Sequence, residues 1–291
     1  MTVHGPADGW VEGPGGQRFW GRAGAAGLLA VDAGRVLLQH RVAWSHFGGT
    51  WGLPGGARDV DESAVAGALR ESAEEAAVPP DALEVAFTSV LDLGFWSYTT
   101  VVARVTRPFE HVISDAESTE LAWVPVAEVD HLPLHPGLAA SWPLLRAQLD
   151  RRLRLVVDVA NVVGSRPDGW WRDRAGATER LLDAVEGSTD EGWPARWFGL
   201  DEEGPGAPTL VRAPVTAVVE GEARAVADRS GEVLVERASA DGDATIVRVA
   251  AGAAEQVAVV TADRALAQRV RAAGAAVLAP SALLTLLDDR R

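Results

Sequence analysis

The chain has 291 residues, a length that fits one or two domains, and 47% of them are hydrophobic, which is enough for a buried core in each. It carries 27 basic and 41 acidic residues, a net charge of -14, and contains neither cysteine nor lysine. This composition excludes Schiff-base enzymes, Walker-type phosphate loops, thiol nucleophiles, disulfide scaffolds and cysteine-ligated zinc. Catalysis must therefore use carboxylates, arginine, histidine or hydroxyl groups.

The N-terminal residues 1–24 are rich in glycine and polar residues. They lack the basic and then apolar pattern of a signal peptide, and no stretch of the chain approaches the roughly 18 apolar residues that a membrane span needs. We therefore expect a cytoplasmic protein without a membrane partner. The acidic excess also disfavours non-specific binding to nucleic acid, which needs clustered positive charge.

Residues 1–150 are predicted to form a first domain, with strands around one strong helix. The helix spans Ser63–Ala76, follows acidic and hydroxyl residues, and ends before two prolines. A second helix is predicted at Leu138–Leu149. The predicted strands are Ala25–Val31, Val36–Gln39 and Thr99–Val105.

Residues 151–291 are predicted to form a second domain, in which strands alternate with helices. This alternation is typical of a mostly parallel sheet covered on both faces. All six histidines precede residue 151, so this domain has no imidazole for acid-base chemistry. We interpret residues 187–214 as a loop or insertion. The predicted strands are Leu155–Val157, Val215–Val219, Val233–Glu236, Val257–Thr261 and Ala276–Leu278. The predicted helices are Ala175–Val185, Ala244–Ala251, Ala265–Ala273 and Ser281–Leu287.

Three glutamates on the first predicted helix form a candidate metal site. Glu71, Glu74 and Glu75 stand at i, i+3 and i+4, which places their carboxylates on one face within about one turn. Such hard oxygen ligands suit Mg²⁺ or Mn²⁺ shared with substrate phosphates. A solvated acidic helix face is the commoner explanation for this pattern in isolation.

The residues before the helix favour the metal site. From Gly56 onward the chain follows Gly-x5-Glu-x7-Arg-Glu-x-x-Glu-Glu, with all six fixed positions filled: Gly56, Glu62, Arg70, Glu71, Glu74 and Glu75. This pattern resembles the Nudix box of the Nudix hydrolases, and the resemblance extends over about residues 18–149. It implies an α/β/α sandwich with a mixed sheet. Two positions depart from the family pattern, since Ala77 replaces a usual glycine and Ser72 a usual apolar residue.

The resemblance implies a role for each matching residue. Glu71 and Glu75 would be the principal ligands of Mg²⁺ or Mn²⁺, together with the backbone carbonyl of Gly56. An acid from outside the box would join them; Glu117 and Glu120 are the candidates, and Glu117 is slightly preferred. Glu74 would be a ligand or the base that activates water. Arg70 would hold the carboxylate cluster, and Glu62 would support the loop.

The implied reaction is hydrolysis of a nucleoside diphosphate linked to another moiety. The alternative is a non-catalytic nucleotide or RNA sensor, but such proteins lose the box glutamates, which are intact here. The substrate stays open. Several aromatic residues could stack on a base or simply pack in the fold: Trp44, His46, Phe47, Trp96, Tyr98 and His135.

The second domain carries polar residues just after predicted strands or at helix starts. Asp158 and Asn161 follow the first strand, Asp243 precedes a helix, and Asp263 follows another strand. Each acid alone could be a helix N-cap. Together they resemble the metal site of NYN and PIN-like nuclease domains, which are α/β/α folds with a mostly parallel sheet. The resemblance implies a Mg²⁺- or Mn²⁺-dependent ribonuclease, with single-stranded RNA as a partner, or a degenerate module that binds RNA or nucleotides without cleavage.

Aromatic and basic residues near this site suit a single-stranded ligand. Two adjacent tryptophans could stack on bases, and nearby arginines could meet phosphates. These residues are Trp170, Trp171, Arg166, Arg172 and Arg174.

Overall fold

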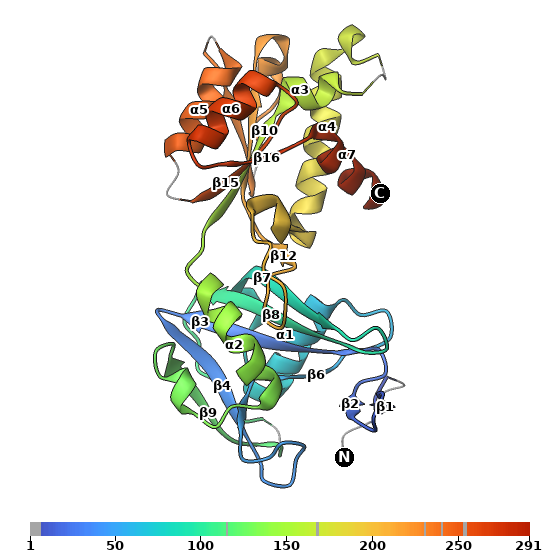
Figure 1. Ribbon diagram of the computed structural model, residues 1–291, viewed down its shortest axis with the longest axis vertical. Helices are drawn as coiled ribbons and strands as arrows, with labels where there is room; N and C mark the ends of the chain where they lie inside the picture. Colours follow the sequence, from blue (N-terminus) through green and yellow to red (C-terminus); the bar gives the residue numbers. More distant parts are fainter. Residues whose placement is uncertain (1–6, 115, 167–168, 230, 240, 253–254) are drawn as a thin grey trace. The chain divides into compact units, whose positions relative to one another are not determined.

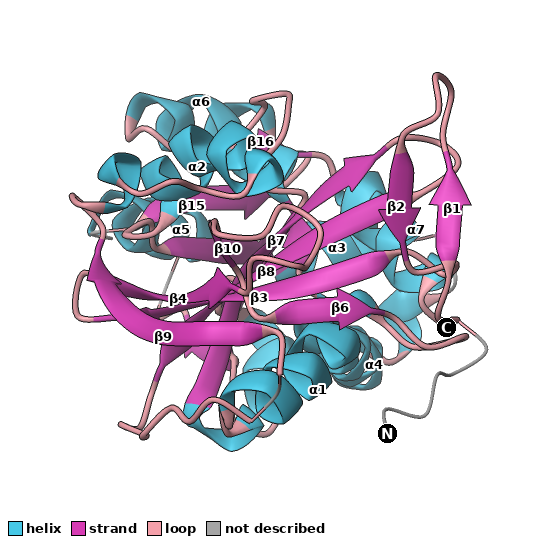
Figure 2. Ribbon diagram, turned by 90° about the horizontal axis from the view of Figure 1, so that it is seen from below, coloured by secondary structure: helices cyan, strands magenta, loops and turns pink. Residues whose placement is uncertain are grey.

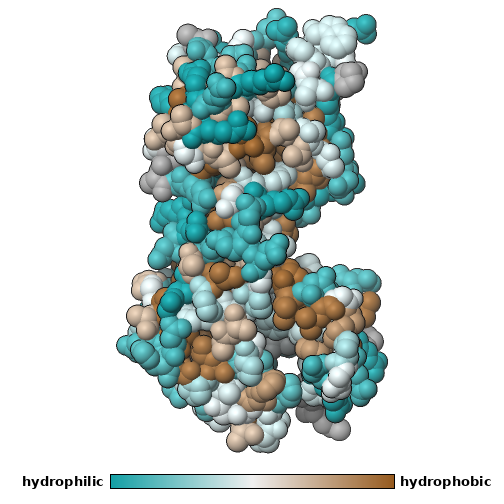
Figure 3. Space-filling view, viewed as in Figure 1, coloured by the Kyte–Doolittle hydropathy of each residue, from teal (hydrophilic) through white to brown (hydrophobic). Residues whose placement is uncertain are grey.

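The computed structural model describes residues 7–114, 116–166, 169–229, 231–239, 241–252 and 255–291. The chain divides into two compact units, Met1–Leu149 with Glu202–Thr209, and Asp150–Asp201 with Leu210–Arg291. Within the described part of the chain, no helix combines the length and the apolarity that crossing a bilayer requires. On the face of each unit drawn in Figure 3, hydrophobic side chains are interspersed with hydrophilic ones.

The first unit is built on a mixed sheet. Its central path runs β7 (Leu83–Asp92), β8 (Ser97–Val105), β3 (Ala25–Asp32), β4 (Arg35–Arg41) and β5 (Trp51–Gly52). In addition, β6 (Gly55–Ala57) pairs with the start of β3, and β9 (Ser118–Pro125) pairs with β4. The β3–β8 pair is parallel, whereas the other pairs along this path are antiparallel. A separate hairpin precedes the sheet, formed by β1 (Trp10–Glu12) and β2 (Arg18–Trp20).

Two helices cover this sheet, α1 (Ala64–Ala76) and α2 (Pro136–Gln148), and Figure 2 shows them on opposite sides of it. Short 3-10 turns lie at Pro80–Ala82 and Val129–His131. Helix α1 buries Ala68 and Ala76 against alternate residues of β3, β4 and β8, including Leu28, Leu37 and Val101. Because these strands carry apolar side chains at every second position, one sheet face packs against α1 and leaves the polar face of α1 free for the site.

A segment from the second half of the chain completes the first unit. We call Glu202–Thr209 the return segment, because the chain leaves the second unit at Asp201 and re-enters it at Leu210. The N–H of Thr209 donates to the carbonyl of Thr88 on β7 at 2.7 Å, and its hydroxyl oxygen accepts from the N–H of Val90 at 3.2 Å. The return segment therefore extends the hydrogen bonding of β7.

The second unit is built on a parallel sheet in the order β14 (Val233–Arg237), β13 (Val215–Val219), β10 (Leu153–Asp158), β15 (Gln256–Val260) and β16 (Ala276–Leu278). Figure 1 shows helices on both sides of this sheet. One side carries α5 (Gly242–Gly252) and α6 (Arg264–Ala272); the other carries α3 (Val159–Gly164), α4 (Arg174–Ser188) and α7 (Pro280–Asp289). The predicted mixed α/β fold, with a mixed sheet followed by a mostly parallel one, is confirmed.

The interpretation of residues 187–214 as a loop is wrong in part. This stretch contains 3-10 turns at Thr189–Glu191 and Ala195–Phe198, and a short antiparallel pairing of β11 (Trp193–Pro194) with β12 (Leu210–Val211). Trp193, Trp197 and Phe198 are buried. Their large apolar surfaces require packing, and this overrides the turn-forming tendency of the surrounding glycines and prolines.

Candidate active site

Helix α1 carries the three predicted glutamates, and local contacts define both of its ends. The side-chain oxygen of Ser63 accepts a hydrogen bond from the N–H of Ala66 at 3.1 Å, which caps the first turn. At the other end Ala77 adopts a left-handed conformation with φ of +52°. Buried Ser72 satisfies its hydroxyl by donating to the carbonyl of Leu69 at 3.0 Å. Ser72 is thus accommodated without an unpaired hydroxyl, whereas Ala77 carries backbone strain that glycine would not.

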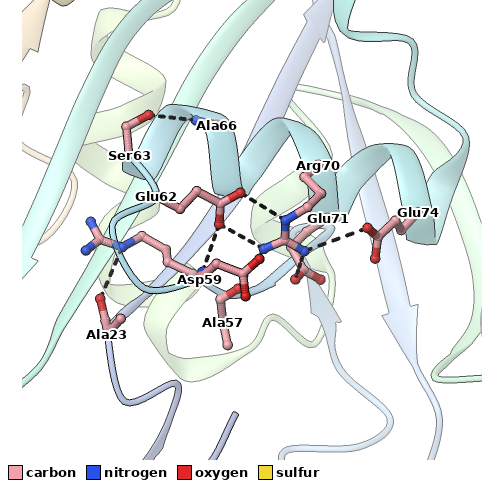
Figure 4. Close-up of polar contacts among 10 residues, drawn as sticks. Ala23, Ala57, Asp59, Glu62, Ser63, Ala66, Arg70, Glu71 and Glu74 are labelled. Carbon is pink, nitrogen blue, oxygen red and sulfur yellow. Dashed lines mark hydrogen bonds and ion pairs between the residues drawn. The ribbon is translucent and has the colours of Figure 1, made fainter. Parts of the chain in front are cut away.

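Arg70 is the centre of the polar contacts on the free face of α1 (Figure 4). Its Nε and Nη2 donate to the two carboxylate oxygens of Glu62, both at 2.9 Å, and Nη2 also donates to the carbonyl of Ala57 at 3.0 Å. Its Nη1 donates to Glu71 Oε1 at 2.6 Å and lies 3.8 Å from Glu74 Oε1. One guanidinium therefore joins the loop before the helix to two of the three glutamates, as its five fixed donors allow.

Glu71 and Glu75 both meet the glycine loop that precedes α1. The N–H of Gly55 donates to Glu75 Oε2 at 2.9 Å. A Cβ atom at Gly56 would lie 2.6 Å from Glu71 Oε2, so glycine is needed there for the carboxylate to approach the backbone. At Gly55 a Cβ atom would lie 2.4 Å from the carbonyl oxygen of Ala26. The structure thus brings Gly56, Glu71 and Glu75 together.

Glu74 and Glu117 are more exposed than the other predicted ligands. The Glu74 side chain is 64% exposed, and that of Glu117 is 52% exposed and lies 3.8 Å from Arg41 Nη2. In the described residues of the chain, no group of three or more Asp, Glu or His side chains stands in position to hold a metal ion. Instead, the carboxylate of Glu71 accepts a hydrogen bond from Arg70, and that of Glu75 accepts one from the N–H of Gly55.

The electrostatics of the cluster follow from these contacts. The hydrogen bonds from Arg70 lower the pKa of Glu62, and the hydrogen bond to Glu62 raises the pKa of Arg70. Burial raises the pKa of Glu71 above its usual value, and the charges of Glu74 and Asp8 raise it further, against the effect of Arg70. Sequence reasoning missed Asp8, because it lies outside the box and approaches Glu71 only through the fold.

Comparison with known proteins assigns this site to a family. The model of the NUDIX domain matches residues 21–147. A Mycobacterium tuberculosis protein provisionally named 8-oxo-dGTP diphosphatase 3 is 51% identical over 156 residues, which cover 50% of this chain and 71% of that protein. The chain belongs to the Nudix hydrolase family. The predicted resemblance of the first half is therefore confirmed.

Two further relatives match the Nudix domain. A nucleoside triphosphate pyrophosphatase/Nudix hydrolase fusion protein from Bifidobacterium longum is 43% identical and is covered over 33% of its length, against 51% of this chain. The crystal structure of a Nudix hydrolase from M. smegmatis, RenU, is 50% identical, with coverage of 48% of this chain and 93% of that one and a TM-score of 0.45. The NUDIX domain and the relative that is 51% identical make the protein a hydrolase acting on pyrophosphate bonds, in a family that generally uses divalent metals.

Outside the Nudix domain, the second unit places polar side chains at the carboxyl edge of its parallel sheet. The chain runs outward from β10 to β13 and β14 and then crosses to β15, so that β10 and β15 flank the topological switch point. The hydroxyl of buried Thr261, just after β15, donates to Asp158 Oδ2 at 2.8 Å. The N–H of Ala262 donates to Asn161 Oδ1 at 3.0 Å. Asp158 and Asn161 thus bridge the switch point, although Asp158 also caps α3 by accepting from the Asn161 N–H.

Other acids lie around Asp158. Burial raises its pKa, and the charges of Asp243 and Glu220 raise it further. Partial burial and then the charge of Asp263 raise the pKa of Asp243. Asp263 also caps α6 by accepting from the N–H of Leu266 at 2.8 Å. Electrostatic interactions thus link Asp158 to Asp243 and Asp243 to Asp263, although among the described residues no three acids stand in position to hold a metal ion. Sequence reasoning missed Glu220, whose carboxylate accepts from the N–H of Gly242 at 3.1 Å.

Aromatic and basic residues follow α3. Trp171 is 57% exposed, and the guanidinium of Arg174 lies 5.4 Å from the ring centre of Trp170. Arg166 instead pairs with Asp288 on α7 at 2.8 Å. Helix α3 begins where β10 ends, at the carboxyl edge of the parallel sheet. Residues Trp170–Arg174 therefore follow α3 in the chain segment that leaves the sheet at this edge.

Proposed function

We propose that the Nudix domain hydrolyses a purine nucleoside triphosphate, including forms with an oxidised base, and releases a nucleoside monophosphate and pyrophosphate. The class of substrate comes from the relative that is 51% identical and carries the name of an 8-oxo-dGTP diphosphatase. The observation that carries the catalytic part is the meeting of Glu71 and Glu75 at the Gly55–Gly56 loop. We also propose residues 1–150 and 151–291 as the two functional domains.

The residues of the loop and α1 fit a divalent metal by their donor chemistry. They offer carboxylate and carbonyl oxygens without nitrogen or sulfur, the set that Mg²⁺ and Mn²⁺ prefer. We propose Glu71, Glu75, Glu74, Glu117 and the carbonyl of Gly56 as the groups that hold it. When bound, the metal would neutralise diphosphate charge and lower the pKa of a water molecule.

The chain's own residues would divide the remaining work. Glu74, with its exposed carboxylate, would accept the proton of the attacking water, while the bond between the phosphorus and its bridging anhydride oxygen breaks. Arg70 would set the positions of Glu71 and Glu74, because its bidentate contact with Glu62 fixes the guanidinium.

The test is hydrolysis of a substrate panel with Mg²⁺: 8-oxo-dGTP, dGTP, ADP-ribose and a dinucleoside tetraphosphate. We expect the wild type to turn over the purine triphosphates, Glu75→Gln to lose most of this activity, and Glu84→Gln, an exposed acid on β7, to match the wild type. A wild type without turnover on any substrate, or a Glu75→Gln variant with normal rates, would refute the proposal.

For the second domain we propose a PIN-like, divalent-metal-dependent ribonuclease that acts on single-stranded RNA. The observation that favours it is the grouping of Asp158, Asn161, Asp243 and Asp263 around the switch point of the sheet, where ligands of open α/β folds bind. The acids would hold Mg²⁺ or Mn²⁺, and Trp171 would stack on a base.

Cleavage of single-stranded RNA in Mg²⁺ or Mn²⁺ tests this second proposal. We expect Asp158→Asn to lose cleavage and Asp289→Asn, an exposed acid at the end of α7, to retain it. If the wild type does not cleave, or both variants cleave equally, the ribonuclease proposal is wrong. Binding of the same RNA by a wild type that does not cleave it would favour the binding module instead.

A further inference from the structure

An exposed phenylalanine in the loop after β4 adopts an unfavourable backbone conformation. Phe47 has φ of +56°, and its side chain is 44% exposed. A bulky residue in the left-handed region is strained, and such strain persists where the surrounding structure enforces it. Because Phe47 stays 44% exposed, its contacts with neighbouring rings cover only part of its surface.

The loop at 42–50 is built to hold that conformation. The N–H of Gly48 donates to the carbonyl of Ser45 at 2.9 Å, and the hydroxyl of Thr50 donates to the carbonyl of Phe47 at 2.6 Å. A Cβ atom at Gly48 would lie 2.4 Å from the carbonyl oxygen of Val42, so the turn is as tight as glycine permits. The Phe47 ring is therefore presented by a fixed turn.

Rings from separate parts of the first unit gather around Phe47. Its ring centre lies 4.2 Å from that of His46 and 4.8 Å from that of His135, which precedes α2. The His46 ring in turn lies 5.5 Å from Trp10 of β1. Burial and the nearby Arg41 lower the pKa of His46, and the same causes lower that of His135 to about 4. Both shifts favour the uncharged form of the imidazole, in which the two rings are aromatic contacts for Phe47.

Arg41 connects these rings with the candidate catalytic residues. Its Nε donates to the carbonyl of His46 at 3.2 Å. Arg41 and Glu75 both act electrostatically on Tyr98. The hydroxyl of Tyr98 lies against Gly27, which pairs with Gly55, and Gly55 donates to Glu75. Arg41 thus lies between the aromatic surface, which it meets at His46, and Glu117, whose carboxylate is 3.8 Å from Arg41 Nη2. Tyr98 lies within reach of the charges of both Arg41 and Glu75.

We propose that the ring of Phe47 is the surface on which the base of the nucleotide substrate stacks, with His46 and His135 fixing the ring. This assignment rests on the proposed nucleotide hydrolysis. A planar base has a polarised π-face that stacks on an exposed ring with little regard to its hydrogen-bonding edges. Phe47 therefore contributes affinity for the base and leaves the phosphate contacts to the residues around α1.

The substitution Phe47→Gly tests this role, because glycine removes the ring and also relieves the strain at φ of +56°. We expect KM for a purine nucleoside triphosphate to rise roughly 5- to 100-fold at nearly unchanged kcat. The inhibition constant of inorganic tripolyphosphate, which has no base, stays at its wild-type value. Phe47→Trp retains an aromatic face and restores KM.

Ala33→Gly is the matched control, since it removes a left-handed residue, with φ of +45°, from the turn between β3 and β4 and touches no ring of the cluster. Its kinetics should equal those of the wild type. If Phe47→Gly leaves KM unchanged, or raises KM and the tripolyphosphate constant equally, the stacking role is wrong. A wild type that hydrolyses no nucleotide refutes the proposed function itself, and the stacking role with it.

Discussion

The rigid guanidinium of Arg70 donates hydrogen bonds to three residues, and this determines which side chain can replace it. The guanidinium contacts Glu62 with two donors while it also reaches Ala57 and Glu71. Lysine has a single charged nitrogen and cannot keep this geometry. We expect Arg70→Lys to raise the Mg²⁺ concentration needed for half-maximal hydrolysis about 10- to 100-fold. Arg107→Lys, in an exposed pair with Asp81, should be neutral; equal behaviour of the two variants would contradict the assigned role of Arg70.

Ala77 offers a prediction about stability alone. With φ of +52° it ends α1 in a conformation that glycine adopts without strain. Glycine also adds freedom to the unfolded chain, so the net gain is smaller than the strain that it removes. We expect Ala77→Gly to raise the free energy of unfolding by about 0.5 to 1 kcal/mol, measured as a higher thermal midpoint. A lower midpoint would show that Ala77 is not strained.

At the scale of elements, the sequence pattern predicted those parts of the fold that are stabilised by contacts between residues close in sequence. Helix α1 and its loop were predictable because Arg70 contacts Glu62 and Glu71, and Glu71 lies against Gly56, all within one short stretch of chain. Strand β7 was not, because a register shift between Val85 and Phe87 breaks the alternation that identifies a strand. The electrostatic effect of Asp8 on Glu71 depends on a contact between residues far apart in sequence. The left-handed conformation of Phe47 is a backbone angle. Residue spacing reveals neither.

The return segment makes a second prediction at this scale. Gly206 has φ of +89°, and a Cβ atom there would lie 2.1 Å from the carbonyl oxygen of Ser141 on α2. Any side chain must therefore push the segment off the first unit. We expect Gly206→Ala to lower the free energy of unfolding by about 2 kcal/mol or more. Gly204→Ala is the control, because Gly204 also has a positive φ, +117°, but open space around its Cβ position. Its loss of stability measures the cost of the backbone angle without a steric clash. Equal losses in both variants would mean that the return segment does not depend on this contact.

For the whole molecule, the chain has no lysine or cysteine, and its two candidate sites are built mainly from carboxylates. One site lies in the first unit and the other in the second. If both proposals hold, the two activities must be separable. Glu75→Gln should lower nucleotide hydrolysis at least about 100-fold and leave RNA cleavage intact, and Asp158→Asn should do the reverse. Chelation with EDTA should abolish both, because both proposed mechanisms use water activated by a divalent metal. The measurement is both assays on the same preparation of each full-length variant.

Loss of both activities in one variant would show that the sites are not independent. RNA cleavage that survives EDTA would exclude the metal mechanism for the second domain.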